Sequence, residues 1–287
     1  CILAFYSHKM KHILATIRLV GLAVLFTLTS LLVVVGRIFG KKGAHAMFRI
    51  GVYCKGQLLG IRSKVYGQCT YQTQLILANH PSYLDIMFFN LIKHPTTILA
   101  ASNFKNWPLV GWLGRAINII WIKRNDRNAG RQVLVEGEKR FNKEMCLMTC
   151  PEGRTSGTHD IYPVKPGLFL LAQRTKVPIT FMCFKYKNNA VPYFHSLKQG
   201  FVPHFLKHFW QVLGQWHIPV EIYFSEPQFF NDVKEAMQAF YDFNKSHLQD
   251  VLHFEVPVKE EFIGEALTRI DPSNLSFRAE SKEELLA

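Results

Sequence analysis

Short apolar runs alternate along most of the chain with segments in which apolar residues recur at helical spacing. The first pattern is typical of buried strands, and the second is typical of amphipathic helices. Strands are predicted near residues 64–68, 74–79, 97–101, 117–122, 145–149, 179–184 and 220–224. Helices are predicted near residues 83–92, 108–115, 129–142, 166–175 and 232–252. The alternation predicts an α/β fold with a single mixed sheet flanked by helices.

An uncharged apolar segment, residues 19–35, precedes this alternation, and basic residues flank it on both sides. Its length is at the lower limit for crossing about 30 Å of hydrocarbon. No small-x-small cleavage site follows before Arg37, which favours a retained anchor over a cleaved signal peptide. The positive charge at both ends slightly favours a segment whose two ends face the same side, and spanning and re-entrant arrangements both stay open.

Residues 47–61 carry apolar side chains at helical spacing, with Arg49 and Lys55 between them. This pattern favours a helix lying on a membrane surface, with a helix that faces a protein core as the alternative. We therefore expect residues 1–62 to form membrane-anchoring helices and residues 63–254 to form the catalytic domain. Residues 255–287 are polar and charge-rich towards their end, and are predicted to be a partly disordered extension.

Candidate chemistry lies in the stretch Asn79-His80-Pro81-Ser82-Tyr83-Leu84-Asp85, between two apolar runs. A strand is predicted to end at His80 and a helix to begin just after it. Asp85 then lies one helical turn past the entry, where its carboxylate can orient the His80 imidazole as a general base. The spacing Ser82-x-x-Asp85 also fits a helix capping box, so both interpretations stay open.

Three further stretches follow in a fixed order. They are Pro108-Leu109-Val110-Gly111-Trp112 leading to Ile119-Ile120-Trp121-Ile122-Lys123-Arg124, then Cys150-Pro151-Glu152-Gly153-Arg154-Thr155-Ser156, then Val177-Pro178-Ile179. Together with the His80 and Asp85 stretch, this order resembles the glycerolipid acyltransferase family, typified by 1-acylglycerol-3-phosphate (lysophosphatidate) acyltransferase. The resemblance covers residues 79–179.

This resemblance implies that His80 and Asp85 are catalytic. It also implies that Arg124, Glu152, Gly153, Arg154 and Thr155 bind the acceptor, with the arginines on its phosphate. Two departures affect the acceptor site, because Lys123 replaces the usual acidic residue and Arg154-Thr155 reverses the commoner order. The proton-transfer chemistry implied here requires no metal or redox cofactor.

The formal net charge of +13 suits an anionic partner such as a phospholipid surface or a nucleotide-bearing thioester. No zinc-finger, RNA-recognition or helix-turn-helix signature accompanies the charge, so nucleic acid is not a predicted partner. The six cysteines are scattered without a C-x-x-C pair, which predicts reduced thiols, a cytoplasmic-side catalytic domain and no metal site.

The sequence thus predicts a membrane acyltransferase of phospholipid biosynthesis. The expected reaction moves a fatty acyl group from acyl-CoA or acyl carrier protein onto the free hydroxyl of lysophosphatidate. Three alternatives remain: glycerol 3-phosphate as acceptor, a lyso-aminolipid as acceptor, or a catalytically silent membrane-binding relative.

Overall fold

The computed structural model describes residues 2–107, 109–123, 126, 128–193 and 201–251. These residues belong to one compact unit, Cys1–Val256, and the remaining unit, Pro257–Ala287, lies outside the described residues. The predicted extension at residues 255–287 therefore falls outside the described part of the chain. The same applies to Arg124.

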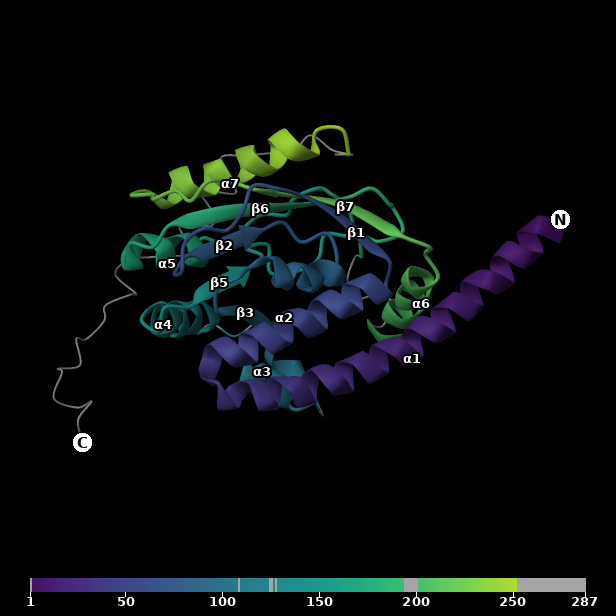
Figure 1. Ribbon diagram of the computed structural model, residues 1–287. Helices are drawn as coiled ribbons and strands as arrows, with labels where there is room; N and C mark the ends of the chain where they lie inside the picture. The colour runs from purple at the N-terminus through teal and green to yellow at the C-terminus, as the bar shows by residue number, and fades with distance from the viewer. Residues whose placement is uncertain (1, 108, 124–125, 127, 194–200, 252–287) are drawn as a thin grey trace. The chain divides into compact units, whose positions relative to one another are not determined.

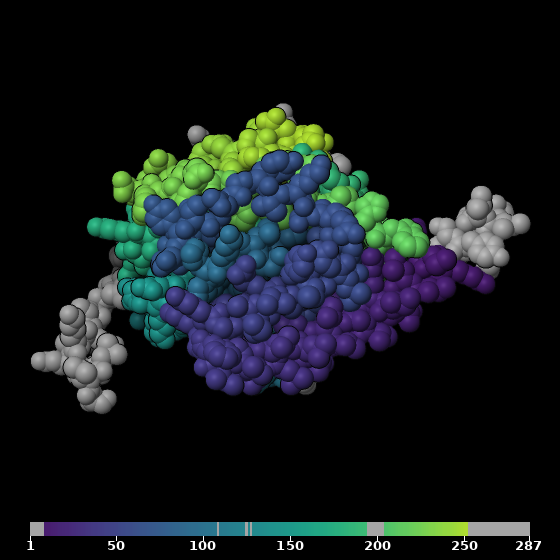
Figure 2. All heavy atoms as spheres, viewed as in Figure 1, coloured from purple at the N-terminus to yellow at the C-terminus, as the bar shows by residue number. Residues whose placement is uncertain are grey.

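Two antiparallel helices begin the fold, α1 (Ile2–Ile38) and α2 (Gly40–Leu58) (Figure 1). Gly40 has φ +76° in the turn between them, and a side chain at Gly43 would lie 2.3 Å from the Gly36 carbonyl oxygen. The two helices therefore approach closely next to the turn, and they lie side by side in the space-filling view (Figure 2). The segment Lys9–Ile38 is long and apolar enough to cross a membrane.

A seven-stranded mixed sheet follows, in the order β1-β7-β6-β2-β5-β3-β4. Its strands are β1 (Ile61–Tyr66), β2 (Leu75–Ala78), β3 (Thr96–Ala101), β4 (Ile120–Ile122), β5 (Cys146–Thr149), β6 (Ile179–Tyr186) and β7 (Ile218–Phe224). All neighbouring strands are parallel except β6 and β7, which are antiparallel. The predicted α/β fold with one mixed sheet is confirmed, and each predicted strand overlaps an observed one.

Helices cover the sheet. They are α3 (Val110–Ala116), α4 (Ala129–Phe141), α5 (Gly167–Thr175), α6 (Phe201–Leu213) and α7 (Val233–Leu248), with short 3₁₀ helices η1 (Tyr83–Leu91) and η2 (Ser102–Phe104). In Figure 1, α7 lies over one face of the sheet near β6, while α2 lies on the other side. The segment after His80, for which helical spacing was predicted, winds as a 3₁₀ helix. Its hydrogen bonds join residues three apart, as from the Asp85 N–H to the Ser82 carbonyl at 3.2 Å.

The sheet is buried most deeply in its centre. Every residue of β2 and of β6 is buried. Such continuous apolar strands are typical of a sheet covered on both faces. The central strands therefore hold the chain segments at their ends in fixed positions, and β2 leads directly to His80.

Candidate functional site

His80 and Asp85 meet where β2 ends and η1 begins. His80 Nδ1 lies 2.8 Å from Asp85 Oδ2, and the His80 side chain keeps 26% of its surface exposed while Asp85 keeps 4%. An imidazole bonded through Nδ1 to a carboxylate is held in one orientation, with its Nε2 available as a base. The arrangement can accept a proton from a hydroxyl group placed at the exposed part of the ring.

Asp85 also caps η1. Its Oδ2 accepts the Ser82 backbone N–H at 3.2 Å, and the Ser82 hydroxyl accepts the Leu84 N–H at 3.3 Å. The capping box and the imidazole contact, which the sequence left as alternatives, therefore coexist on the same carboxylate. The other oxygen, Oδ1, accepts the Tyr186 hydroxyl at 2.8 Å.

The electrostatic surroundings strengthen the base. Burial lowers the pKa of His80, but hydrogen bonds and charge from Cys150 and Asp85 raise it, and the net pKa lies well above the ordinary value. Burial also raises the pKa of the Cys150 thiol, which favours its neutral form. Burial raises the pKa of Asp85, and its contacts with His80, Tyr186 and the Ser82 backbone N–H act in the opposite direction to favour the carboxylate.

Glu152, two residues after Cys150, ties a second segment to His80. Its Oε1 accepts the His80 backbone N–H at 2.8 Å, and its Oε2 accepts the Tyr162 N–H at 2.9 Å. The Ser156 N–H donates to the His80 carbonyl at 2.8 Å. Burial raises the pKa of Glu152 to about 7, against the opposing effect of these hydrogen bonds. The carboxylate of Glu152 thus bonds backbone groups on both sides of the turn.

The other predicted acceptor residues surround this turn. Gly153 has φ +71°, and a side chain there would approach the Lys165 ammonium group to 3.0 Å. Arg154 is exposed and its guanidinium lies 4.2 Å from the centre of the Tyr162 ring. Thr155 is buried at 9% exposure. Lys165 was not among the predicted site residues, because it lies twelve positions beyond Gly153 outside any motif.

Comparison with known proteins agrees with this geometry. Residues 62–185, less than half of the 287-residue chain, match the family model described as Acyltransferase. The predicted resemblance to the glycerolipid acyltransferases is confirmed. The acyltransferase match includes His80, Asp85 and the segment from Cys150 to Ser156.

Curated relatives with acyltransferase names match the chain over part of their length. A lyso-ornithine lipid O-acyltransferase of Rhodobacter capsulatus is 31% identical over 39% of this chain and 40% of its own length. A 1-acyl-sn-glycerol-3-phosphate acyltransferase of Saccharomyces cerevisiae is 32% identical over 42% of each chain. The chain thus spans about two-fifths of the length of these relatives.

A solved structure shares the fold over a longer stretch. The 1-acyl-sn-glycerophosphate (LPA) acyltransferase PlsC of Thermotoga maritima has a TM-score of 0.55 and 18% identity, covering 82% of this chain and 97% of that one. At this identity the likeness shows the acyltransferase fold alone.

Two long-range contacts of the candidate site were missed by sequence reasoning. The Asn79 side chain donates to the Phe184 carbonyl at 3.0 Å and accepts the Phe184 N–H at 2.7 Å. Tyr186 contacts Asp85 from the same strand, β6. The only sequence signal for either contact is that β6 was predicted as a buried strand, which does not specify its neighbour.

Helix α6 packs against Tyr83, which lies between His80 and Asp85 in the sequence. The Tyr83 hydroxyl lies 3.1 Å from His208 Nδ1, and the Tyr83 ring contacts the rings of Phe205 and Phe209. Packing against Tyr83 thus accounts for Phe205, His208 and Phe209 in the aromatic and basic cluster of α6, which also contains Lys207 and Trp210. Leu206 of the same helix is exposed.

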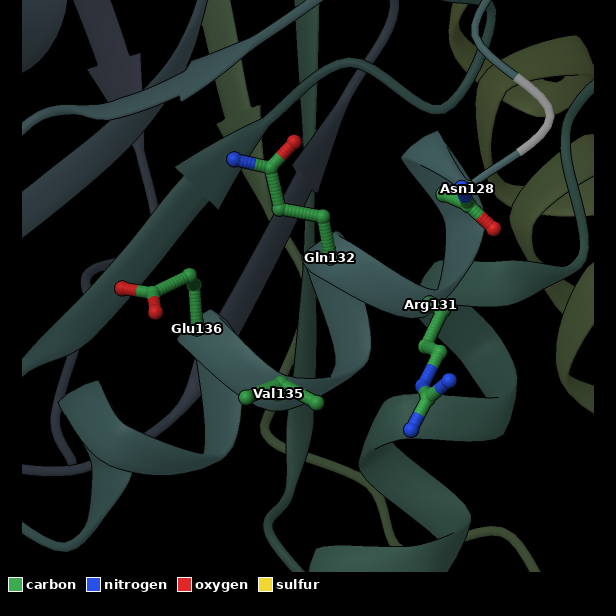
Figure 3. A pocket seen from close by; sticks show the side chains of 5 residues that line it. All are labelled: Asn128, Arg131, Gln132, Val135 and Glu136. Atoms are coloured by element: carbon green, nitrogen blue, oxygen red, sulfur yellow. The ribbon is translucent and has the colours of Figure 1, made fainter. Parts of the chain in front are cut away.

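Two surface cavities lie apart from the His80 and Asp85 pair. One of 330 Å³ is lined by Asn128, Arg131, Gln132, Val135 and Glu136 of the α4 region, whose side chains project in different directions (Figure 3). The other, of 420 Å³, includes Lys11, Lys187 and His217. Neither includes His80, Asp85 or Glu152. Within the described ranges no group of three or more His, Cys, Asp and Glu side chains is arranged to hold a metal ion.

Proposed function

We propose that this protein transfers a fatty acyl group from a thioester onto the free hydroxyl of lysophosphatidate, giving phosphatidate. The observation that carries the proposal is the 2.8 Å contact between His80 Nδ1 and Asp85 Oδ2, inside the segment that matches the acyltransferase family. The acyl donor is acyl-CoA or acyl carrier protein, the two common carriers of an acyl thioester.

The chemistry proceeds by general-base catalysis. His80 Nε2 takes the proton of the acceptor hydroxyl as its oxygen attacks the thioester carbonyl. The resulting tetrahedral intermediate collapses, the carbon–sulfur bond breaks, and the leaving thiolate takes the proton from the imidazolium. Asp85 balances the imidazolium charge, and such proton transfer contributes roughly 10²- to 10⁴-fold to the rate.

The acceptor phosphate is proposed to lie near Gly153 and Arg154. Arg154 is exposed, and a guanidinium can bind phosphate through two parallel hydrogen bonds. The bare backbone at Gly153 and the nearby Lys165 add room and positive charge. Arg124 and Thr155 are proposed to complete the set, Arg124 on the strength of the family resemblance alone. Glu152 acts here through its backbone contacts, because both of its carboxylate oxygens already bond main-chain amides.

A lyso-ornithine lipid is the second candidate acceptor. Curated relatives from Rhodobacter capsulatus and Rhizobium meliloti carry that name, at 31% and 32% identity. Such an acceptor offers the same kind of hydroxyl group to His80, so the catalytic dyad does not discriminate between the two. A phosphate-binding Arg154 favours lysophosphatidate.

Membrane association is proposed for the α1–α2 pair, with the catalytic domain on the cytoplasmic side. Exposed apolar residues of α1 include Ile17, Leu31 and Ile38, at 60%, 60% and 79% exposure. Such a surface is costly in water and favours contact with lipid.

An acceptor panel tests the proposal. Purified full-length protein is supplied with acyl-CoA or acyl carrier protein and with lysophosphatidate, a lyso-ornithine lipid or glycerol 3-phosphate. We expect lysophosphatidate to react fastest. Arg154→Ala should lower kcat/KM for lysophosphatidate roughly ten- to hundredfold, the effect of losing one charge-assisted hydrogen bond, and leave the donor KM unchanged.

The matched control is Arg62→Ala, which removes an arginine on β1 that donates to Gln57 Oε1 at 3.3 Å. It should leave every acceptor unaffected. Preference for the lyso-ornithine lipid in the wild type, or equal losses on all acceptors in Arg154→Ala, would overturn the lysophosphatidate assignment.

A further inference from the structure

Tyr186 is the last residue of β6, and its side chain is fully buried. Its hydroxyl donates to Asp85 Oδ1 at 2.8 Å. The opposite oxygen, Oδ2, serves His80 at 2.8 Å and the Ser82 backbone N–H at 3.2 Å. Each carboxylate oxygen of Asp85 thus has its own donors, and Tyr186 is the donor on the side away from the imidazole.

The position of Tyr186 is rigid. Strand β6 is buried throughout and pairs with β2 on one side and β7 on the other. The rings of Phe88 and Tyr186 lie 6.2 Å apart, and Phe88 belongs to the same 3₁₀ helix as Asp85. A hydroxyl held on such a strand fixes the rotation of the carboxylate that it contacts.

We propose that Tyr186 is a positioning residue for acyl transfer, which holds Asp85 ionised and turned so that Oδ2 meets His80. The proposal rests on the proposed function, since it assigns a role within the same site. Tyr186 lies one residue beyond the segment 62–185 that matches the family model, so the match itself does not include Tyr186.

The sign of the effect follows from charge. With neutral His80, the dyad carries one unshared negative charge on Asp85, and the Tyr186 hydroxyl stabilises it. Once His80 is protonated, the imidazolium neutralises much of that charge and the same hydrogen bond contributes less. Removing the hydroxyl therefore raises the proton affinity of the dyad, so the active neutral imidazole is populated only at higher pH.

Other titratable groups surround the dyad from neighbouring elements. Cys150 and Glu152 approach from the end of β5, and Tyr83 belongs to η1. Burial raises the pKa of each of these groups, to about 7 for Glu152. Glu152 titrates in the range where activity will be measured, so the His80 titration must be followed directly as well as through the rate.

The decisive variant is Tyr186→Phe, which removes the hydroxyl and keeps the ring. Full-length protein in detergent micelles is compared with the wild type by the pH profile of kcat/KM and by NMR titration of the histidine side chains. The His80→Gln spectrum identifies the His80 signal. We expect the His80 pKa and the acid limb of the profile to move up by about one pH unit, which lowers the rate on that limb roughly tenfold.

Tyr223→Phe is the matched control, because Tyr223 on the neighbouring strand β7 donates to Glu221 Oε2 at 3.0 Å. This variant loses an equivalent hydrogen bond and should leave the His80 titration unmoved. Replacement of Tyr186 alone by 3-fluorotyrosine keeps a hydroxyl that is a stronger donor, so it should shift the His80 pKa downwards. If Tyr186→Phe does not fold, the 3-fluorotyrosine protein tests whether the Tyr186 hydroxyl controls the His80 pKa.

An unchanged His80 titration in Tyr186→Phe or in the fluorotyrosine protein would overturn the role of Tyr186. A wild type that acylates no lyso-lipid would instead overturn the proposed function, while the NMR titration would still report on Tyr186. A fall in thermal stability without a change of the His80 pKa would assign the hydroxyl to packing alone and also contradict the proposal.

Discussion

Asp85 combines two tasks that are usually separate. Its Oδ2 caps the start of η1 through Ser82 and orients His80 through Nδ1. One oxygen can make both contacts because the Ser82 backbone N–H and the His80 imidazole lie on the same side of the turn. Asp85 therefore stabilises the local fold of the turn and also orients the proposed base.

Asp85→Asn should separate the two tasks. Asparagine keeps a side-chain oxygen that can accept the Ser82 backbone N–H, the contact that Asp85 makes in the capping box, so the loss of stability should stay within about 1 kcal/mol. It carries no charge to balance the imidazolium and can present the wrong partner to Nδ1, so kcat should fall by at least about a hundredfold. Activity and thermal unfolding of the purified variant are the measurements.

Asp232→Asn is the control for this change. Asp232 caps α7 by accepting the Glu235 N–H at 2.9 Å, away from the site. It should show a similarly small change of stability and normal kcat. If Asp85→Asn retained the wild-type kcat, Asp85 would have only a structural role in the capping box, and its role in catalysis would be contradicted.

The raised pKa of buried Glu152 predicts that the stability of the folded protein depends on pH. Its pKa lies at about 7 in the folded protein, against an ordinary value of 4.5, because the carboxyl group is buried. Between these values the unfolded chain releases the proton first, so stability is greatest below about pH 4.5 and falls as the pH rises to about 7. The loss from this group is on the order of 3 kcal/mol.

Glu152→Gln should remove that pH-dependent part, and at low pH it should lower stability because an amide cannot accept hydrogen bonds through both of its terminal atoms. Unfolding measured across this pH range in detergent checks the difference between variant and wild type. Glu136→Gln, at the Lys139 ion pair on α4, serves as control. Parallel pH curves for wild type and Glu152→Gln would show that Glu152 titrates normally.

At the residue level, the sequence could reveal only contacts made within a short stretch. His80 and Asp85 are five positions apart, so their meeting follows from the local turn. Tyr186 is 101 positions from Asp85 and Glu152 is 72 from His80. Such contacts depend on which strands become neighbours, and that choice has no signature in the spacing of residues.

Among the elements, strand existence was predictable and strand order was not. Apolar runs mark each strand, whereas the placement of β1 and β7 at one edge, with β7 antiparallel to β6, depends on the whole sheet. Boundaries moved by a few residues. The strand predicted at residues 64–68 begins at Ile61, where Gly60 with φ +75° ends the preceding helical segment.

Helix α1 contacts the rest of the protein at its middle and near its C-terminal end. Arg18 donates to the carbonyl of Leu213, the last residue of α6, at 3.0 Å, and Arg37 donates to the carbonyl of Ala116, the last residue of α3, at 3.4 Å. A helix fastened at two such points to one domain lies along it. This arrangement favours an anchor that enters one side of a bilayer and returns.

Labelling can test this arrangement. Lys9→Cys and Lys42→Cys, each in a background without other cysteines, are treated in sealed vesicles with a membrane-impermeant maleimide. We expect both positions to react from the side that carries the catalytic domain, with Lys176→Cys in that domain as the reference. Reaction of the two positions from opposite sides would establish a spanning helix and contradict the prediction.

For the whole molecule, the central feature is the side of the sheet at which the parallel strands β2 and β5 have their carboxyl ends. Strands β2 and β5 are adjacent and parallel, so their carboxyl ends lie side by side. His80 and the Glu152–Arg154 turn follow these two ends and therefore lie close together. Parallel sheets commonly collect binding groups at the carboxyl ends of their strands. The ordered motifs in the sequence could be recognised as a set, while their convergence depended on this pairing.

The most direct test of the account measures phosphatidate formed from lysophosphatidate and an acyl thioester by wild type, His80→Ala and a control, His217→Ala, whose side chain is exposed near β7. The account predicts that His80→Ala loses roughly 10²- to 10⁴-fold in kcat while its membrane association and folding match the wild type, and that His217→Ala is unaffected. A folded His80→Ala that retains more than about a tenth of the wild-type kcat would contradict general-base catalysis by His80.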